Sequence, residues 1–235
     1  MRKSIFVSYI AVFVAFVAAV GLCIRALRAP QAVFSAADAG MKIVLDAGHG
    51  GVDGGVTGKT TGVKESDINL AITRKLKIAL EEVGFEVVLT RKTEGGLYDA
   101  ATKGFKKRDM ERRKQIVQEE KPALVISVHQ NLYPTRSVRG AQVFYNGQNE
   151  KSTRLAREVQ TKLNGLYAKE RVKARKETAA EYFMLSCSDA PAIIVECGFL
   201  SNPEDEKLLI SEGWQVELGK TLTAGVLSYF SGSVS

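Results

Sequence analysis

Cysteine, histidine and tryptophan are all scarce in this chain of 235 residues. It contains 3 cysteines, 2 histidines and 1 tryptophan. No CxxC pair and no cluster of cysteine with histidine occurs, which excludes a metal site built on cysteine. Cys187 and Cys197 are expected to be buried free thiols, with a disulfide between them as the alternative if the domain is exported.

The chain also lacks the charge excess of a nucleic-acid-binding protein. Its net charge is +7, but residues 41–235 hold 29 basic and 25 acidic residues, a net charge of +4. That balance is mildly basic and argues against nucleic acid as a partner. One basic cluster is expected to be a solvated helix face, with contact to an anionic polymer or to lipid headgroups as the alternative; it comprises Lys103, Lys106, Lys107, Arg108, Arg112, Arg113 and Lys114.

One long uncharged run stands at the amino end, over residues 4–24. Its length matches the roughly 17–25 residues of a membrane-spanning helix rather than the roughly 7–15 of a signal-peptide apolar region. A retained anchor is therefore favoured, although the small residues at 35–39 leave cleavage open. Basic residues flank both ends, so charge does not fix the orientation. We expect an anchor or signal segment at residues 1–28, a linker at 29–40 and one catalytic domain at 41–232.

From residue 41 onward, apolar runs of strand length alternate with patterns of helical spacing. This alternation predicts an α/β fold in which a largely parallel sheet lies between layers of helices. Strands are expected at 42–45, 85–90, 123–129, 141–145, 182–185 and 192–196. Helices are expected at about 68–83, 108–120, 152–166, 204–210 and 214–230.

Both histidines follow predicted strands, His49 after the first and His129 at the end of the third. Ligands gather outside the carboxyl ends of strands in α/β sheets, so one crevice can receive both rings. Glu65 stands between a Gly-rich loop and a helix, and Glu196 ends a very apolar strand. Two histidines and a carboxylate are a usual catalytic zinc set, and a second carboxylate can act as general base and acid.

Each of these residues also has an ordinary structural interpretation. A histidine at a strand end is more often hydrogen-bonded within the fold, and Glu65 can complement the dipole of the helix that it begins. Glu196 can serve as an ion-pair partner. Spacing alone does not decide, because this set is not a compact motif such as HExxH.

Five sequence segments, which occur in a fixed order, say more about function than the spacing of single residues does. Residues 45–55 (LDAGHGGVDGG) and 126–131 (ISVHQN) contain the histidines, and 64–70, 90–91 and 195–202 (VECGFLSN) complete the set. Together they resemble the zinc-dependent N-acetylmuramoyl-L-alanine amidases, and the resemblance runs from about residue 42 to residue 230. The resemblance implies a twisted, mixed sheet between helices. It also implies hydrolysis of the amide between N-acetylmuramic acid and L-alanine in peptidoglycan, with one zinc ion bound by His49, Glu65 and His129 and with Glu196 as the catalytic residue.

Within that family, residues 95–98 and 107–110 resemble the spore-cortex, or germination-specific, branch. This implies removal of stem peptides outside the cytoplasm, in a spore former between the forespore membranes, so that a partner deacetylase can form muramic-δ-lactam. Three positions depart from the family pattern. Gln130 stands where a small residue is common and is expected to narrow the crevice beside His129. Cys197 replaces an aliphatic residue or Thr. The family's R…AN pattern in the helix before His129 is only half present, and either Arg112 or Arg113 fills its arginine position.

Two other functions stay open from the sequence. One is a non-catalytic, zinc-holding module that binds peptidoglycan or regulates another hydrolase, and the other is a zinc peptidase that cuts within stem peptides. We also expect an accessory protein for recruitment or activation, because the Gly-rich stretch 50–62 costs entropy to order. The alternative, which is favoured equally, is that the membrane anchor alone gives the enzyme a sufficient local concentration and that no accessory protein is needed.

Overall fold

The structure is a computed structural model that describes residues 40–232. The segments expected to form the anchor and most of the linker, residues 1–28 and 29–39, lie outside the described residues, so both expectations stay predictions. Among the described helices, none combines the length and the apolar character that a membrane span requires.

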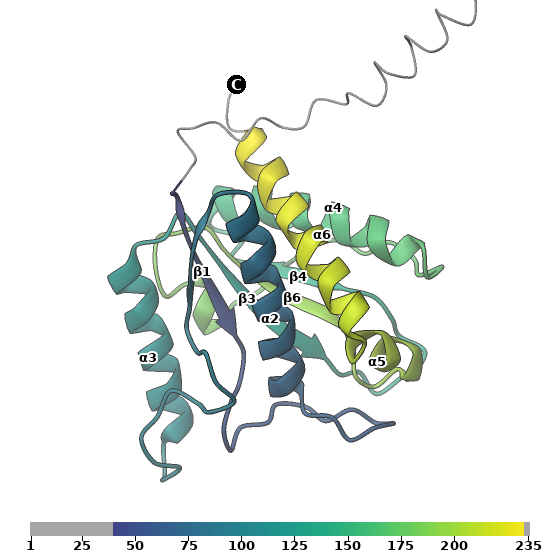
Figure 1. Cartoon of the computed structure of the whole chain (residues 1–235), viewed down its shortest axis with the longest axis horizontal. Helices are drawn as coiled ribbons and strands as arrows, with labels where there is room; N and C mark the ends of the chain where they lie inside the picture. The colour runs from purple at the N-terminus through teal and green to yellow at the C-terminus, as the bar shows by residue number, and fades with distance from the viewer. Residues whose placement is uncertain (1–39, 233–235) are drawn as a thin grey trace, which may run out of the picture. The chain divides into compact units, whose positions relative to one another are not determined.

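A six-stranded sheet organises the described domain, in the order β2-β1-β3-β6-β4-β5 (Figure 1). Parallel pairing joins β2, β1, β3 and β6; β4 is antiparallel to β6, and β5 is parallel to β4. The predicted fold, a mostly parallel mixed sheet between helices, is confirmed. The strands are β1 (Lys42–Ala47), β2 (Glu86–Leu89), β3 (Leu124–Asn131), β4 (Gln142–Tyr145), β5 (Thr178–Ala179) and β6 (Ala192–Phe199).

Helices cover the two faces of the sheet unequally. The larger apolar core lies between the sheet and three long helices, α2 (Glu65–Glu82), α4 (Glu150–Ala168) and α6 (Glu212–Ser231), of which α2 and α6 lie in front of the sheet in Figure 1. The short helix α5 (Pro203–Leu209) follows β6. The smaller core on the opposite face is closed by α3 (Phe105–Glu120) and the 3₁₀ turn η1 (Phe183–Leu185).

Strand alternation decides which side chains reach the thinner face. Successive residues of a strand point to opposite faces, so Leu45 joins the larger core while Val44 joins the smaller one. Both faces are buried, which explains the continuous apolar runs. Near the carboxyl ends of the strands, polar side chains take over the α3 face: Asp46, Ser127, His129 and Glu196.

The predicted secondary structure needs correction at several positions. The strand predicted at 182–185 is wrong, because Leu185 donates its amide to the Tyr182 carbonyl in a 3₁₀ turn. That turn buries the adjacent side chains of Met184 and Leu185 in one core, whereas a strand would send them to opposite faces. The two-residue strand β5 was not predicted, and α3 begins at Phe105, three residues before the predicted start.

Candidate metal centre

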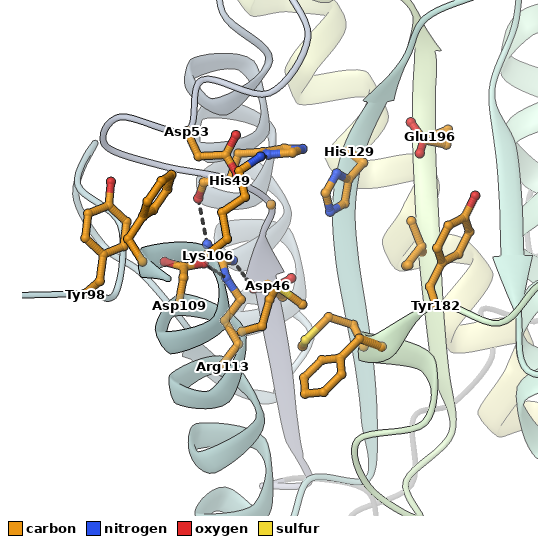
Figure 2. Close-up of a pocket in the computed structure, with 16 residues that line it drawn as sticks. Asp46, His49, Asp53, Tyr98, Lys106, Asp109, Arg113, His129, Tyr182 and Glu196 are labelled. Atoms are coloured by element: carbon orange, nitrogen blue, oxygen red, sulfur yellow. Dashed lines mark hydrogen bonds and ion pairs between the residues drawn. The ribbon is translucent and has the colours of Figure 1, made fainter. Parts of the chain in front are cut away.

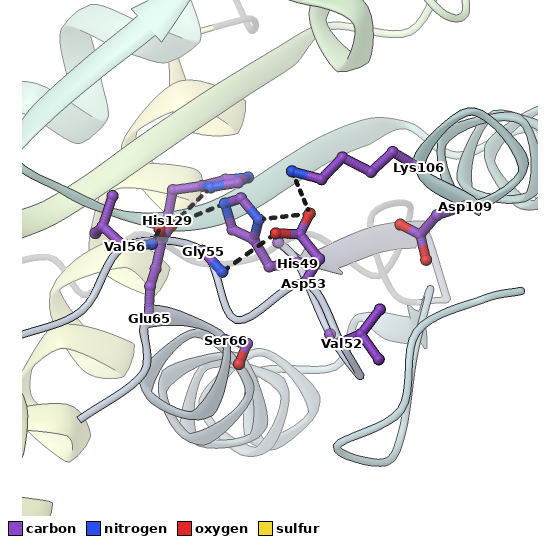
Figure 3. A network of polar contacts seen from close by, with 12 residues as sticks. His49, Val52, Asp53, Gly55, Val56, Glu65, Ser66, Lys106, Asp109 and His129 are labelled. Atoms are coloured by element: carbon purple, nitrogen blue, oxygen red, sulfur yellow. Dashed lines mark hydrogen bonds and ion pairs between the residues drawn. The ribbon is translucent and has the colours of Figure 1, made fainter. Parts of the chain in front are cut away.

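The loop after β1 places His49 and returns the chain to Glu65, the first residue of α2. His49 has a backbone φ of +62°, an unusual left-handed conformation for a residue with a side chain. Its ring Nδ1 lies 3.1 Å from Asp53 Oδ2, and its Nε2 lies 3.3 Å from Glu65 Oε1 (Figure 3). The ring is therefore oriented from both of its nitrogens.

Glu65 is buried at the centre of the cluster. Its Oε1 lies 2.9 Å from His129 Nδ1 and accepts the Gln130 amide at 3.1 Å, while its Oε2 accepts the Val56 amide at 2.9 Å. Burial alone would raise the pKa of Glu65, but hydrogen bonds and charge from His129 and His49 hold that pKa well below its ordinary value. Glu65 is consequently an ionised carboxylate between two imidazoles.

His129 reaches this cluster from β3 across a close backbone contact. A Cβ atom built on Gly48 would lie 2.3 Å from His129 Nε2, which is closer than real atoms approach. Only glycine at position 48 lets the ring lie against the loop that carries His49.

The three residues predicted as ligands come together in the structure. His49, Glu65 and His129 each offer one ligand atom, and these atoms lie within 4.8 Å of one another. Ligand atoms at roughly 2.0–2.2 Å from a tetrahedral zinc are about 3.5 Å apart, so the cluster is already near that size. Asp53, on the far nitrogen of His49, is the outer carboxylate that metal-binding histidines usually have. The donor set fits a zinc ion.

Two buried arginines hold the backbone that presents His49. Arg113 donates to the His49 carbonyl at 2.6 Å and to the Ala47 carbonyl at 2.8 Å. Arg91 donates to the carbonyls of Ala47 at 2.8 Å and Gly48 at 3.1 Å. Three consecutive carbonyls thus receive charge-assisted hydrogen bonds, which stabilise the left-handed turn at His49.

Asp46 provides the counter-charge beneath this turn. It pairs with Arg113 and accepts the hydroxyl groups of Thr90 at 2.7 Å and Ser127 at 2.6 Å. Burial alone would raise the pKa of Asp46, but the charge of Arg113 and the two hydroxyl donors lower it to about 2. Arg113 lies on α3, where it also bonds Asp109 one turn away, and its ion pair with Asp46 of β1 ties α3 to the sheet.

Glu196, a half-buried residue, has a different environment. It lies on β6 directly opposite His129 of β3, and its Oε2 is buried with no hydrogen-bond partner. Burial is the main cause that raises the pKa of Glu196 to about 7; the charge of His129 opposes the rise and that of Glu65 adds to it. A carboxyl group with a pKa near neutrality can both accept and deliver a proton.

A cavity of about 380 Å³ joins these groups on the α3 face. Figure 2 shows His49, His129 and Glu196 among the residues that line it. Its walls are largely apolar, with Tyr98, Phe105 and Met110 on the α3 side and Tyr182, Phe183, Met184 and Ile194 on the side of η1 and β6.

Several sequence predictions near the site can now be assessed. Gln130 does not narrow the crevice, because its side chain lies buried against Asn69 of α2, with Nε2 3.1 Å from Asn69 Oδ1. Cys187 and Cys197 are both free and buried. Arg113 is 1% exposed and was wrongly assigned to a solvated face. Of the two candidate arginines, Arg113 is the one that bonds the backbone of His49.

Comparison with known proteins assigns the family. The profile of the N-acetylmuramoyl-L-alanine amidase family matches residues 43–228, most of the chain. The chain belongs to this family. It is an N-acetylmuramoyl-L-alanine amidase, and peptidoglycan is the class of substrate on which such enzymes act.

Individual relatives agree with this assignment. The chain is 32% identical to the germination-specific N-acetylmuramoyl-L-alanine amidase of Bacillus subtilis over 195 residues, 82% of this chain and 81% of the relative. It is similar to the CwlD amidase of Clostridioides difficile, solved in complex with the GerS lipoprotein, with a TM-score of 0.78 and 32% identity over 82% of this chain and 99% of that one. It is also similar to the structure of an N-acetylmuramoyl-L-alanine amidase from Clostridium difficile 630, with a TM-score of 0.72 and 28% identity over 83% of this chain and 99% of that one.

Proposed function

We propose that this amidase uses one zinc ion, held by His49, Glu65 and His129, and that Glu196 is its catalytic acid and base. The scissile bond is the amide between the lactyl group of N-acetylmuramic acid and L-alanine. The observation that carries the proposal is one cavity in which Glu196, with a buried carboxylate oxygen that has no hydrogen-bond partner, lies beside a His-Glu-His cluster.

The reaction divides between the metal and the carboxyl group. A bound zinc ion supplies Lewis acidity, which polarises the amide carbonyl and lowers the pKa of water to about 7 in well-studied hydrolases. Glu196 accepts the proton of the attacking water as the water oxygen bonds to the lactyl carbon. It then delivers a proton to the alanine nitrogen as the C–N bond breaks, which leaves a lactyl carboxyl group and a free amine.

Product analysis and metal content test the two parts of this proposal. Digested peptidoglycan should release intact stem peptides that begin with a free L-alanine amine, as seen by mass spectrometry. Cuts within the peptide would instead indicate a zinc peptidase, and no release at all would indicate a non-catalytic module. His49→Ala and His129→Ala should each lose stoichiometric zinc by elemental analysis while keeping the wild-type circular dichroism spectrum. A folded variant that keeps its zinc would contradict the ligand assignment.

The germination-specific relative supports a finer role in the spore cortex. In this role the enzyme removes stem peptides so that a peptidoglycan deacetylase can complete muramic-δ-lactam. The enzyme then works outside the cytoplasm, with residues 1–28 as membrane tether through 4–24, 29–40 as linker and 41–232 as catalytic domain. Cortex from a strain with Glu196→Gln should lack muramic-δ-lactam, and unchanged lactam content would contradict this role.

An accessory protein is also part of the proposal. A similar amidase was solved together with a lipoprotein, which supports recruitment or activation by a protein partner. Zinc content and turnover of the purified protein alone provide the test. Full metallation and brisk cleavage without any partner would remove the need for one.

A further inference from the structure

A surface beside β6, the strand that carries Glu196, has a concentration of positive charge that the proposed chemistry does not use. It consists of two loops, residues 136–139 after β3 and residues 169–177 after α4, named here the basic rim. These loops contain 7 basic and 2 acidic residues, a net charge of +5. Residues 41–235 as a whole carry only +4, so the remainder of the domain is net negative. The α3 cluster differs, because α3 mixes 6 basic with 4 acidic residues.

Most of the charge on the basic rim faces solvent without a counter-ion. Arg139 pairs with Glu204 and Asp205 of α5, and Glu177 pairs with Arg157. Within residues 40–232, by contrast, the structure shows no ion pair for the exposed side chains of Arg136, Lys169, Arg171, Lys173 and Lys176. Exposed cations that face solvent together attract anions and repel one another, so the rim is suited to an anionic partner.

The basic rim lies close to β6, the strand that carries Glu196. Gln142 of β4 lies directly opposite Glu196 in the antiparallel pair, so the two side chains share a face. Gln142 Nε2 donates to the Lys176 carbonyl at 3.2 Å and to Thr178 Oγ1 at 2.7 Å. Since neighbouring strands lie about 4.8 Å apart, the rim begins roughly 10 Å from the backbone of Glu196. A second contact comes from Arg175, whose guanidinium lies 4.9 Å from the ring centroid of Phe199, the last residue of β6.

The two loops are held to each other. Arg175 exchanges main-chain hydrogen bonds with the Asn164 side chain, at 3.0 Å from its amide and 2.8 Å to its carbonyl. Its Nε donates to the Arg139 carbonyl at 2.9 Å, which joins one loop to the other. Between them lies a groove of about 390 Å³ lined by Arg139, Arg171, Lys173 and Arg175. A fixed arrangement of cations loses less entropy on binding than a flexible one.

We propose that the basic rim binds carboxylates of peptidoglycan stem peptides next to the one being cut. The inference rests on the proposed function, because it takes peptidoglycan as the substrate. A glycan strand presents many stem peptides, and each uncross-linked peptide ends in a carboxylate. One peptide enters the cavity at Glu196 while a neighbouring peptide reaches the cations beyond β4. The rim thereby favours strands that still carry several peptides.

The test compares two charge-reversed variants of equal net charge. Arg171→Glu/Lys173→Glu changes the rim, whereas Lys121→Glu/Lys151→Glu changes two exposed lysines beside Pro122 and Pro191, at the amino ends of β3 and β6. Each pair is placed in the full chain with Glu196→Gln, and binding to insoluble peptidoglycan is measured by sedimentation. Exposed ion pairs are individually weak, so we expect about three- to tenfold weaker binding for the rim variant only. The difference should vanish near 1 M salt.

Two further arms separate the sources of negative charge. Peptidoglycan stripped of other anionic polymers should show the same difference, and glycan strands already freed of peptides should show none. Cleavage of a single disaccharide-peptide by the rim variant with Glu196 intact should equal that of wild type, which isolates binding from chemistry. Equal losses in both charge-reversed variants, no loss in the rim variant, or a difference that persists on peptide-free glycan would overturn the proposal. Failure of the disaccharide-peptide to be cut by wild type would count against the proposed function instead.

Discussion

Two carboxyl groups near the carboxyl ends of strands behave in opposite ways. Asp46 of β1 is surrounded by donors from Arg113, Thr90 and Ser127, and its pKa is lowered to about 2. Glu196 of β6 has an Oε2 with no partner, and its pKa is raised to about 7. Burial alone would raise both pKa values; the surrounding donors make the difference. Asp46 is therefore a permanent charge beneath the loop that carries His49, whereas Glu196 has a pKa at which a carboxyl group can gain or lose a proton near neutral pH.

The largest effect should come from the group without partners. Glu196→Gln removes the exchangeable proton but keeps the shape of the side chain, so turnover should fall on the order of 10²–10⁴-fold. Zinc content should stay at the wild-type level. Glu82→Gln, the same substitution at an exposed position at the end of α2, is the control and should change neither quantity. Near-normal turnover of Glu196→Gln would show that this residue is structural.

Breaking the satisfied cluster around Asp46 should be visible as a loss of folding stability. Arg113→Met leaves Asp46 buried without its cation, and the loss of one partner from a buried pair typically costs about 3–5 kcal/mol. Unfolding in urea measures this loss. The double variant Asp46→Asn/Arg113→Met should recover part of it, because no uncompensated charge remains. Strict additivity of the two single effects would contradict the coupling.

The two carboxyl groups should also give opposite pH dependence of stability in metal-free protein. Asp46 has a lowered folded pKa, so its contribution is full above the unfolded value near 3.8 and is lost as the pH falls toward 2, an effect of about 2 kcal/mol. Glu196 has a raised folded pKa, so the folded state loses about 3 kcal/mol as the pH rises from 4.5 through 7. Glu196→Gln should abolish the loss of stability between pH 4.5 and 7, and Asp46→Asn should reduce the loss of stability between about pH 4 and 2. The free energy of unfolding in urea, measured between pH 2 and 8, tests both expectations. A variant that keeps the wild-type pH dependence in its own range would contradict the corresponding one.

A smaller effect is expected for Asp53, a carboxyl group with fewer partners than Asp46 and more than Glu196. Asp53 is half-buried and contacts both His49 and Lys106. Asp53→Asn weakens the orientation of the His49 ring, so zinc affinity should fall about 10- to 100-fold in competition with a chelator. Asp67→Asn, at an exposed position of α2, should leave the affinity unchanged. Equal affinities for the two variants would remove Asp53 from the metal centre.

The sequence predicted the chemical groups better than it predicted the residues that support them. His49, His129 and Glu196 stand out because a histidine is rare here and a carboxylate is costly at the end of an apolar strand. Arg113 did not, since it lies in a basic cluster whose other members are largely solvated, and only the distant Asp46 makes its burial favourable. Likewise, β5 spans two residues and forms through pairing with β4, which no local pattern reveals.

The connectivity of the sheet has a consequence for how the chain folds. Asp46 bonds Ser127 across 81 positions of sequence, and Arg113 reaches Asp46 across 67. Contacts between such distant residues require long loops to close, which slows folding in comparison with locally connected domains. The carboxyl group opposite His129 arrives only when β6, near the end of the domain, joins β3. A chain interrupted before β6 would still hold all three candidate ligands in its sequence yet lack the strand that completes their surroundings. Tight zinc uptake should therefore follow assembly of the whole sheet and can serve as a reporter of its completion.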